Sequence, residues 1–87
     1  MHHTVKSWPW FFQPMLEGKK KHDMRSKDRD YSVGDTITLQ EFDPRNGQYT
    51  GKSLDVKITY ITSNDSPCAL SSAYLDNNAV ILSVEKV

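Results

Sequence analysis

The sequence has one cysteine, few glycines and no excess of charge, and each scarcity excludes a class of protein. Cys68 is alone among the 87 residues, so an internal disulfide is impossible and a reducing cytoplasm is the expected location. The four glycines occur singly, which excludes a glycine-rich phosphate loop. Lys and Arg number 11, as do Asp and Glu, which argues against polyanion binding by the whole surface.

Long apolar runs and metal-binding patterns are also missing. No run approaches the ~18 residues of a membrane helix, and the N-terminal "MHHTVKSW" lacks the apolar region of a signal peptide. The spacing of His2, His3, His22 and Cys68 matches no metal site, so we expect neither metal nor cofactor. We interpret His2 and His3 as a disordered start. Cys68 has no evident His or Asp partner, which argues against a nucleophilic role.

What is present predicts one small soluble domain covering residues 1–87. Charged residues make up 25% and hydrophobic residues 37% of the chain, which is typical of a globular protein. Hydrophobic periodicity predicts a strand, a helix and then four strands, with a loop carrying one helical turn before the last strand. The expected strands are 3–6, 19–25, 36–42, 53–61 and 79–87, and the helical turn falls near 71–75.

The predicted helix lies in "WPWFFQPMLE". Ser7 is the expected N-cap, Pro9 lies in the first turn and Gly18 follows the end. Pro14 predicts a bend or a short helix, because an internal proline removes a backbone hydrogen bond. Apolar side chains recur at spacings of three, four and seven, and we expect them to share one buried face: Trp8, Phe11, Phe12, Met15 and Leu16.

The later strands alternate between apolar and polar residues. Ile37 and Leu39 share one face, and four residues do so in the next strand: Leu54, Val56, Ile58 and Tyr60. "DPRNGQ" between these two strands predicts a hairpin turn, and the apolar "AVILSVEKV" predicts a central strand. A curved sheet whose apolar faces meet gives an α+β, mainly β fold: a small β-barrel with one N-terminal helix.

Basic residues are concentrated in one segment, "GKKKHDMRSKDRD". It holds six of the eleven Lys and Arg residues: Lys19, Lys20, Lys21, Arg25, Lys27 and Arg29. As a strand, it places Asp23 and Arg25 on one face and Lys20 with His22 and Met24 on the other. A charge run is usually a solvated surface, and "DRD" in this segment is also compatible with a salt-bridged loop that holds Arg29 inside the fold.

Several runs of the sequence resemble the ASCH domain of the PUA-like superfamily, in particular a small bacterial and phage branch. These are "LEGKKKHDMR", "DRDYSVGDTITLQEFDPRNGQYTG" and "AVILSVE". The similarity spans residues 3–85 apart from 63–78. Two positions depart from the branch pattern: Lys21 replaces Thr and Asp23 replaces Glu.

The resemblance implies a PUA-like barrel with a cleft beside the helix and the Gly-Lys-Lys strand, and binding of RNA or modified nucleosides. Some relatives hydrolyse an acetylated cytidine with a Lys, a Thr three residues later and a distant Glu. By position the Lys is Lys20, but Asp23 stands where the Thr would be. No residue can be assigned as the Glu, so we expect no catalytic residue.

The residue types themselves fit a nucleotide site. Lys20, Lys21, Arg25 and Arg29 would attract phosphates, and Asp23 could orient Lys20 or Arg25 or accept from a base amino group. Three aromatics could stack on a base: Trp8, Trp10 and Tyr31. We expect Trp10 to do so, since it is out of phase with the apolar helix face.

The leading hypothesis is therefore a non-enzymatic RNA- or nucleotide-binding module. Its site is Lys20, Lys21, Asp23 and Arg25, with Trp10 and Arg29 as outer members. A protein-interaction or regulatory domain without nucleic-acid affinity is the alternative, favoured by the neutral net charge. A nucleoside-processing enzyme is the third hypothesis. No membrane association is expected, and the sequence leaves the oligomeric state open.

Overall fold

The computed structural model describes all residues from 1 to 87, and its elements follow the predicted order. They are β1 (His2–Ser7), α1 (Pro9–Leu16), β2 (His22–Ser26), β3 (Thr36–Asp43), β4 (Gln48–Thr62), α2 (Ser71–Tyr74) and β5 (Ala79–Lys86). The short α2 is the helical turn expected in the loop before the last strand. Neither helix has the length and apolar character needed to span a membrane.

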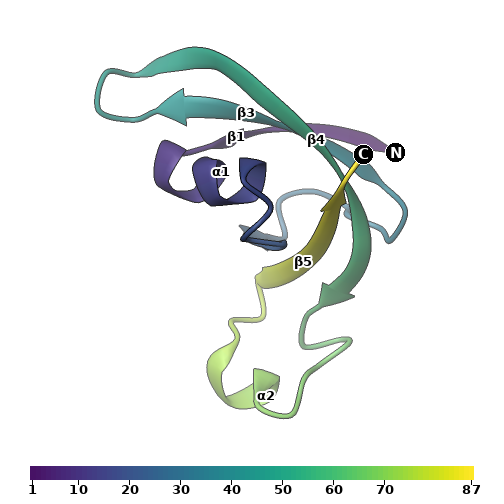
Figure 1. Cartoon of the computed structure of the whole chain (residues 1–87). Helices are drawn as coiled ribbons and strands as arrows, with labels where there is room; N and C mark the ends of the chain where they lie inside the picture. Colours follow the sequence, from purple (N-terminus) through teal and green to yellow (C-terminus); the bar gives the residue numbers. More distant parts are fainter.

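All five strands form one sheet in the order β1-β3-β4-β5-β2. β1 runs parallel to β3, and the other neighbours are antiparallel. The long strand β4 bends over its length, so the sheet curls into a half-barrel, with α1 inside the curl and α2 beyond the ends of β4 and β5 (Figure 1). β1 and β2 are the two edges, and β5 is an interior strand as its apolar sequence predicted.

The alternation in β3 and β4 is confirmed, except near the end of β4. Ile37 pairs with Val56, and both side chains are buried. The pairing of β4 with β5 shifts register between Ile58 and Tyr60. This bulge reverses the alternation, so Tyr60 is 55% exposed and Ile61 packs against the core instead. The prediction that Tyr60 faces inward was therefore wrong.

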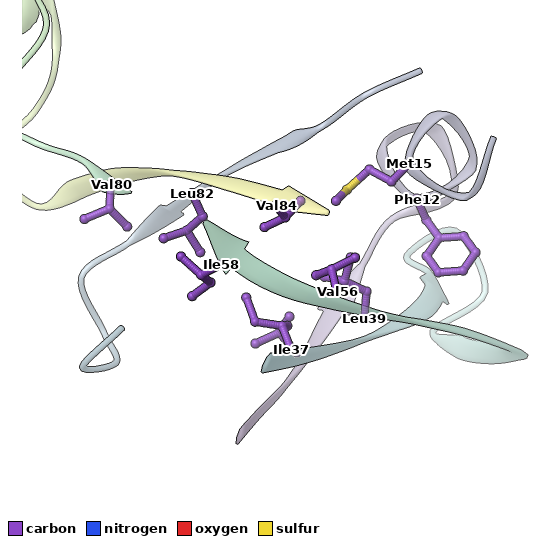
Figure 2. Packing of buried hydrophobic residues seen from close by; sticks show 10 residues of the cluster. Phe12, Met15, Ile37, Leu39, Val56, Ile58, Val80, Leu82 and Val84 are labelled. Carbon is purple, nitrogen blue, oxygen red and sulfur yellow. The ribbon is translucent and has the colours of Figure 1, made fainter. Parts of the chain in front are cut away.

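The core lies on the concave face of the sheet, beneath α1. Side chains of β3, β4 and β5 form one cluster with Phe12 and Met15 of the helix. Val84, Val56 and Leu39 lie toward the helix, and the other labelled strand residues lie further from it (Figure 2). The cluster contains ten buried residues: Val5, Phe12, Met15, Ile37, Leu39, Val56, Ile58, Val80, Leu82 and Val84. Burial of this apolar surface is the main force holding the curled sheet and the helix together.

The helix buries fewer aromatics than its sequence predicted. Phe12 and Met15 are buried, but Trp8 is 45%, Phe11 45% and Leu16 38% exposed, so these three assignments were wrong. A helix of eight residues makes only about two turns, and its narrow inner stripe accommodates two large side chains. It is short and contains Pro14, as expected.

The ends of α1 also differ from the prediction. Trp8, rather than Ser7, is the N-cap, because Ser7 is still part of β1 and pairs with Glu41. After the helix, the backbone N–H groups of Lys19 and Lys20 donate to the carbonyl of Pro14 at 2.9 and 3.1 Å. These bonds prolong the helix end, so β2 begins at His22 and not at residue 19.

His2 and His3 form part of β1, which corrects the interpretation of a disordered start. The His2 ring lies 2.6 Å from the Thr36 hydroxyl and 2.8 Å from the Thr38 hydroxyl. His3 is buried, and its Nε2 lies 2.8 Å from Oδ2 of Asp35. The N-terminal segment is thus held to β3 by side chains as well as by the strand ladder.

Candidate functional site

One side chain joins the two edges of the sheet. Arg25 of β2 donates from Nη2 to the backbone carbonyl of Lys6 in β1, at 2.8 Å. We call the region between these edges, centred on Lys6 and Arg25, the seam. Three cavities lie along it, and the residues that line them come from all five strands, α1 with its N-cap, and the connections after β2 and β4.

Asp23 holds the cations of the seam in place. It is 7% exposed, and its Oδ2 accepts from Nε of Arg25 at 2.7 Å. Its Oδ1 lies 3.7 Å from Nζ of Lys20, which also lies 5.4 Å from the centre of the Phe11 ring. Asp23 and Arg25 are two apart on a strand and therefore share a face. The carboxylate fixes the guanidinium, whose remaining N–H donors stay available to a ligand.

The first cavity lies between α1 and β2, and we call it the helix cavity. It has a volume of about 350 Å³ and is lined by Lys6, Ser7, Trp8, Phe11, Asp23, Met24 and Arg25. Trp8 and Phe11 are stacked with their rings 6.1 Å apart and 20° between planes. The cavity thus combines half-exposed aromatic rings with cations, which suits a flat ring carrying an anionic group.

The second cavity lies on the other side of Lys6 and Arg25, and we call it the tyrosine cavity. It has a volume of about 320 Å³ and is lined by Thr4, Val5, Lys6, Arg25, Asp28, Arg29, Tyr31, Gln40 and Tyr49. Three cations face one carboxylate here. Nζ of Lys6 lies 5.8 Å from the Tyr49 ring and 4.3 Å from the Phe42 ring, which places its charge beside aromatic faces.

The third cavity, which we call the acidic cavity, continues past Arg29 and Tyr31. It has a volume of about 510 Å³ and is lined by Lys27, Asp28, Arg29, Asp30, Tyr31, Ile61, Ser63, Asp65 and Val80. Three carboxylates outnumber two cations, and Lys27 is already paired with Asp65 at 3.3 Å. The charge along the seam therefore changes sign at Arg29.

Tyr31 lies where the tyrosine and acidic cavities meet. Burial raises the pKa of its phenol above 10.0; the charge of Arg25 opposes that shift, and Asp28 reinforces it. Its ring centroid lies 4.9 Å from that of His3. Tyr31 thus stays a neutral hydrogen-bonding group near neutral pH, next to both arginines.

The residues predicted from the sequence fall in four places. Lys20, Asp23 and Arg25 form the ion-paired cluster described above, and Arg29 lines the tyrosine and acidic cavities. Trp10 is exposed and packs against Trp8 at 5.4 Å, but it lines none of the three cavities.

Lys21 lies apart from the seam. Its backbone carbonyl accepts from Val84, and it lines a small recess of about 30 Å³ beside Met15 and Lys86. Lys20 lines the same recess and none of the three cavities, so it reaches the seam only through its ion pair with Asp23.

Two kinds of residue were missed by sequence reasoning. Lys6 and Tyr49 belong to the seam although they are distant in the sequence from the basic segment, and no local pattern indicates this. Glu41 had a signal, because it continues the inward alternation of Ile37 and Leu39. It is 2% exposed and accepts from Gln13 at 3.0 Å and from Thr50 at 2.6 Å, which ties α1 to the β3–β4 hairpin.

The structure contains no group of three or more His, Cys, Asp or Glu side chains arranged to hold a metal ion. The side chains of the seam offer guanidinium and ammonium donors, one fixed carboxylate and several aromatic faces. Such a set can bind an anion and stack against a ring.

Comparison with known proteins places the chain in a family. It is 42% identical over 60 residues to an uncharacterised 12.9 kDa protein in the GpA 3' region of Escherichia phage P2. That alignment covers 69% of this chain and 53% of the relative, so the chain spans about half the length of the curated relative it matches. Residues 2–83 match the family described as a domain of unknown function, DUF3850. The chain belongs to the DUF3850 family.

Proposed function

We propose that this chain is a non-enzymatic RNA- or nucleotide-binding module built on a PUA-like barrel, with the seam as its binding site. One observation carries the proposal: Lys6, Arg25 and Arg29 line one cavity, and the first two also line the adjacent one beside Trp8 and Phe11. Single-stranded RNA recognition uses cations that contact phosphates and exposed aromatic rings on which unstacked bases stack. The lone, exposed Cys68 fits a reducing cytoplasm.

Positive charge is concentrated at the seam, so the chain can bind a nucleic acid there although its net charge is zero. Affinity for a nucleic acid comes from cations that contact phosphates, and not from the charge of the whole molecule. The seam places Lys20 near Arg25 through the shared partner Asp23. Arg25 is held in a fixed orientation, so less conformational entropy is lost when it binds a phosphate.

We assign no catalytic step to the seam. The ASCH-like amidohydrolases would need a Thr where Asp23 stands. Asp23 faces Arg25 with one carboxylate oxygen and Lys20 with the other. A carboxylate engaged on both sides orients cations and is poorly placed to act as a nucleophile or a general base.

Fluorescence anisotropy with labelled single-stranded and hairpin RNA at two salt concentrations tests the proposal. The wild type should bind, and the logarithm of its affinity should fall with log salt by about 0.7 per phosphate contacted. A Lys20→Ala/Arg25→Ala variant should lose binding while circular dichroism shows that it remains folded. Lys57→Ala is the matched control, because Lys57 is an exposed cation on β4 outside the seam. Absence of binding by the wild type would overturn the proposal.

A protein-interaction role is the second candidate, and a specific observation favours it. Trp8 at the N-cap of α1 forms an exposed aromatic cluster with Trp10 and Phe11 of the helix, with ring centroids 5.4 to 6.1 Å apart. Exposed clusters of this kind occur at protein interfaces. In the same anisotropy experiment this candidate predicts no salt-dependent RNA binding by the wild type.

A further inference from the structure

We infer that the seam takes a terminal phosphate monoester, at the end of a strand or on a mononucleotide, in preference to an internal phosphodiester of a continuous strand. This inference rests on the proposed function, and it goes further by naming the chemical class of the ligand. Three features of the seam carry it: the charges of the tyrosine cavity, the reversal of charge in the acidic cavity, and the aromatic wall of the helix cavity.

The tyrosine cavity has more positive charge than a phosphodiester requires. Lys6, Arg25 and Arg29 line it with Asp28 as the one carboxylate. A phosphate monoester carries about 1.5 to 2 negative charges near pH 7 and three strong acceptor oxygens, whereas a diester carries one charge. Tyr31 and Gln40 add hydrogen-bonding groups to the same lining. The cavity is thus matched to the more highly charged and better-accepting group.

The acidic cavity opposes a strand that would continue beyond this phosphate. Asp28, Asp30 and Asp65 lie along it, and its two cations do not offset them. A second phosphate placed there would meet carboxylates, and like charges brought together at this range repel. The chain of phosphates would therefore have to stop at Arg29, which both cavities share.

The helix cavity provides the place for the nucleoside attached to that phosphate. It shares Lys6 and Arg25 with the tyrosine cavity, so the two cavities are neighbours with these two residues between them. Trp8 and Phe11 present half-exposed rings there. Volumes of about 350 and 320 Å³ are each at the lower end of small-molecule pockets, so the pair suits a unit of about one nucleotide.

Isothermal titration calorimetry with unlabelled ligands tests the inference. The ligands are one eight-nucleotide RNA with hydroxyl ends, the same RNA with a 5'-phosphate or a 3'-phosphate, a nucleoside and its 5'-monophosphate. We expect a phosphorylated end to raise the affinity by about tenfold or more, as charge-assisted hydrogen bonds would. The monophosphate should likewise bind more tightly than its nucleoside. Comparing the two phosphorylated RNAs with the monophosphate shows whether the preferred phosphate belongs to the end of a strand or to a free nucleotide.

The outcomes separate this inference from the proposed function. Equal, salt-dependent affinity for all three RNAs would support a nucleic-acid-binding seam and overturn the preference for a terminal phosphate. No binding of any ligand would overturn both. Preference for a phosphorylated ligand that weakens as pH falls through about 6, where the monoester takes up its second proton, would support the inference.

Two variants test the charges one by one. Arg29 is exposed and lines the tyrosine cavity, so Arg29→Gln should leave the fold intact and reduce the preference for phosphorylated ends. Asp30→Asn/Asp65→Asn removes exposed carboxylates of the acidic cavity. This double variant should raise the affinity for the hydroxyl-ended RNA, so the ratio of affinities between phosphorylated and hydroxyl-ended RNA should fall. An unchanged preference in both variants, with Lys57→Ala as the matched control, would overturn the inference.

Discussion

The guanidinium of Arg25 contacts the Asp23 carboxylate through Nε at 2.7 Å and the Lys6 carbonyl through Nη2 at 2.8 Å. It therefore connects β2 to β1, the two edges of the sheet, which have no backbone hydrogen bonds to each other. Exposed strand edges are sites of unwanted pairing. Here one side chain spans the opening of the half-barrel and at the same time separates two cavities of the candidate site.

Replacing Arg25 by Lys should show how much the hydrogen-bond geometry of the guanidinium contributes to stability when the positive charge is kept. An ammonium group keeps the charge but cannot make the forked contacts to Asp23 and Lys6 together. We expect Arg25→Lys to lower the free energy of unfolding by about 1 to 2 kcal/mol, the scale of a hydrogen bond to a charged group that is partly solvated. Urea unfolding measures this. A variant as stable as the wild type would show that the contact between the edges contributes nothing.

The strands were predictable because each follows from neighbouring residues. Alternation of Ile37 and Leu39, and of Val56 and Ile58, needs only the two-residue period of a strand. The bulge before Tyr60 was not predictable, since it depends on how β4 pairs with β5, in which the partner of Tyr60 is Ser83, 23 residues further along. The exposure of Trp8 and Phe11 likewise depends on where the helix meets the curled sheet, and not on helical periodicity.

The candidate site could be predicted only where it is local. Asp23 and Arg25 lie on one face because they are two apart on a strand, and Lys20 precedes them in the same segment. Lys6 and Tyr49 join the seam through the curl of the sheet, which brings together strands that are distant in the sequence. Trp10 is exposed, as its position out of phase with the apolar helix face predicts, but it packs against Trp8 and does not lie beside the cations.

Phe12 is expected to be the most important helix residue for stability. It is fully buried against the sheet, whereas Trp10 on the same helix is 47% exposed. Phe12→Ala removes the contacts and leaves a cavity, so we expect a loss of about 3 to 5 kcal/mol in the free energy of unfolding. Trp10→Ala is the matched control and should cost far less. Equal losses in urea unfolding would contradict the burial of Phe12 as the anchor of α1.

Gly34 should resist substitution because of its backbone and not because of crowding. Its φ is +96°, and a Cβ added there would meet nothing within 4 Å. Gly34→Ala should cost about 1 to 2 kcal/mol from the left-handed conformation alone. Ser32→Ala in the same turn is the control, since it leaves the backbone free to keep its conformation. Thermal unfolding measures both, and a neutral Gly34→Ala would mean that the turn can change its conformation without cost.

Comparing Trp8 with Trp10 tests whether RNA stacks in the helix cavity or on any exposed aromatic ring. Both are about half exposed, but only Trp8 lines the helix cavity beside Arg25. If the base stacks there, Trp8→Ala should weaken RNA binding by about 1 to 3 kcal/mol, the usual value of one stacked base. Trp10→Ala should have a smaller effect. Anisotropy titrations of both variants give the comparison, and a larger loss for Trp10→Ala would move the stacking position out of the seam.

Asp35 should make the stability of the fold depend on pH in the acidic range. Hydrogen bonds from His3 and the Met1 amino group lower its pKa from 3.8 to about 2, and the Ser32 N–H also donates to it at 3.0 Å. Since the pKa is lower in the folded state, the stabilisation is fully present above about pH 4 and is lost as pH falls toward 2.

Asp35→Asn removes this contribution, so it should lower the unfolding free energy at neutral pH and flatten its decline between pH 4 and 2. Urea unfolding of both proteins at several pH values measures the difference. Asp55→Asn is the control: Asp55 is an exposed carboxylate that accepts from Thr38 on the neighbouring strand. A wild-type curve that declines as gently as the Asp35→Asn curve would mean that another group carries the acid sensitivity.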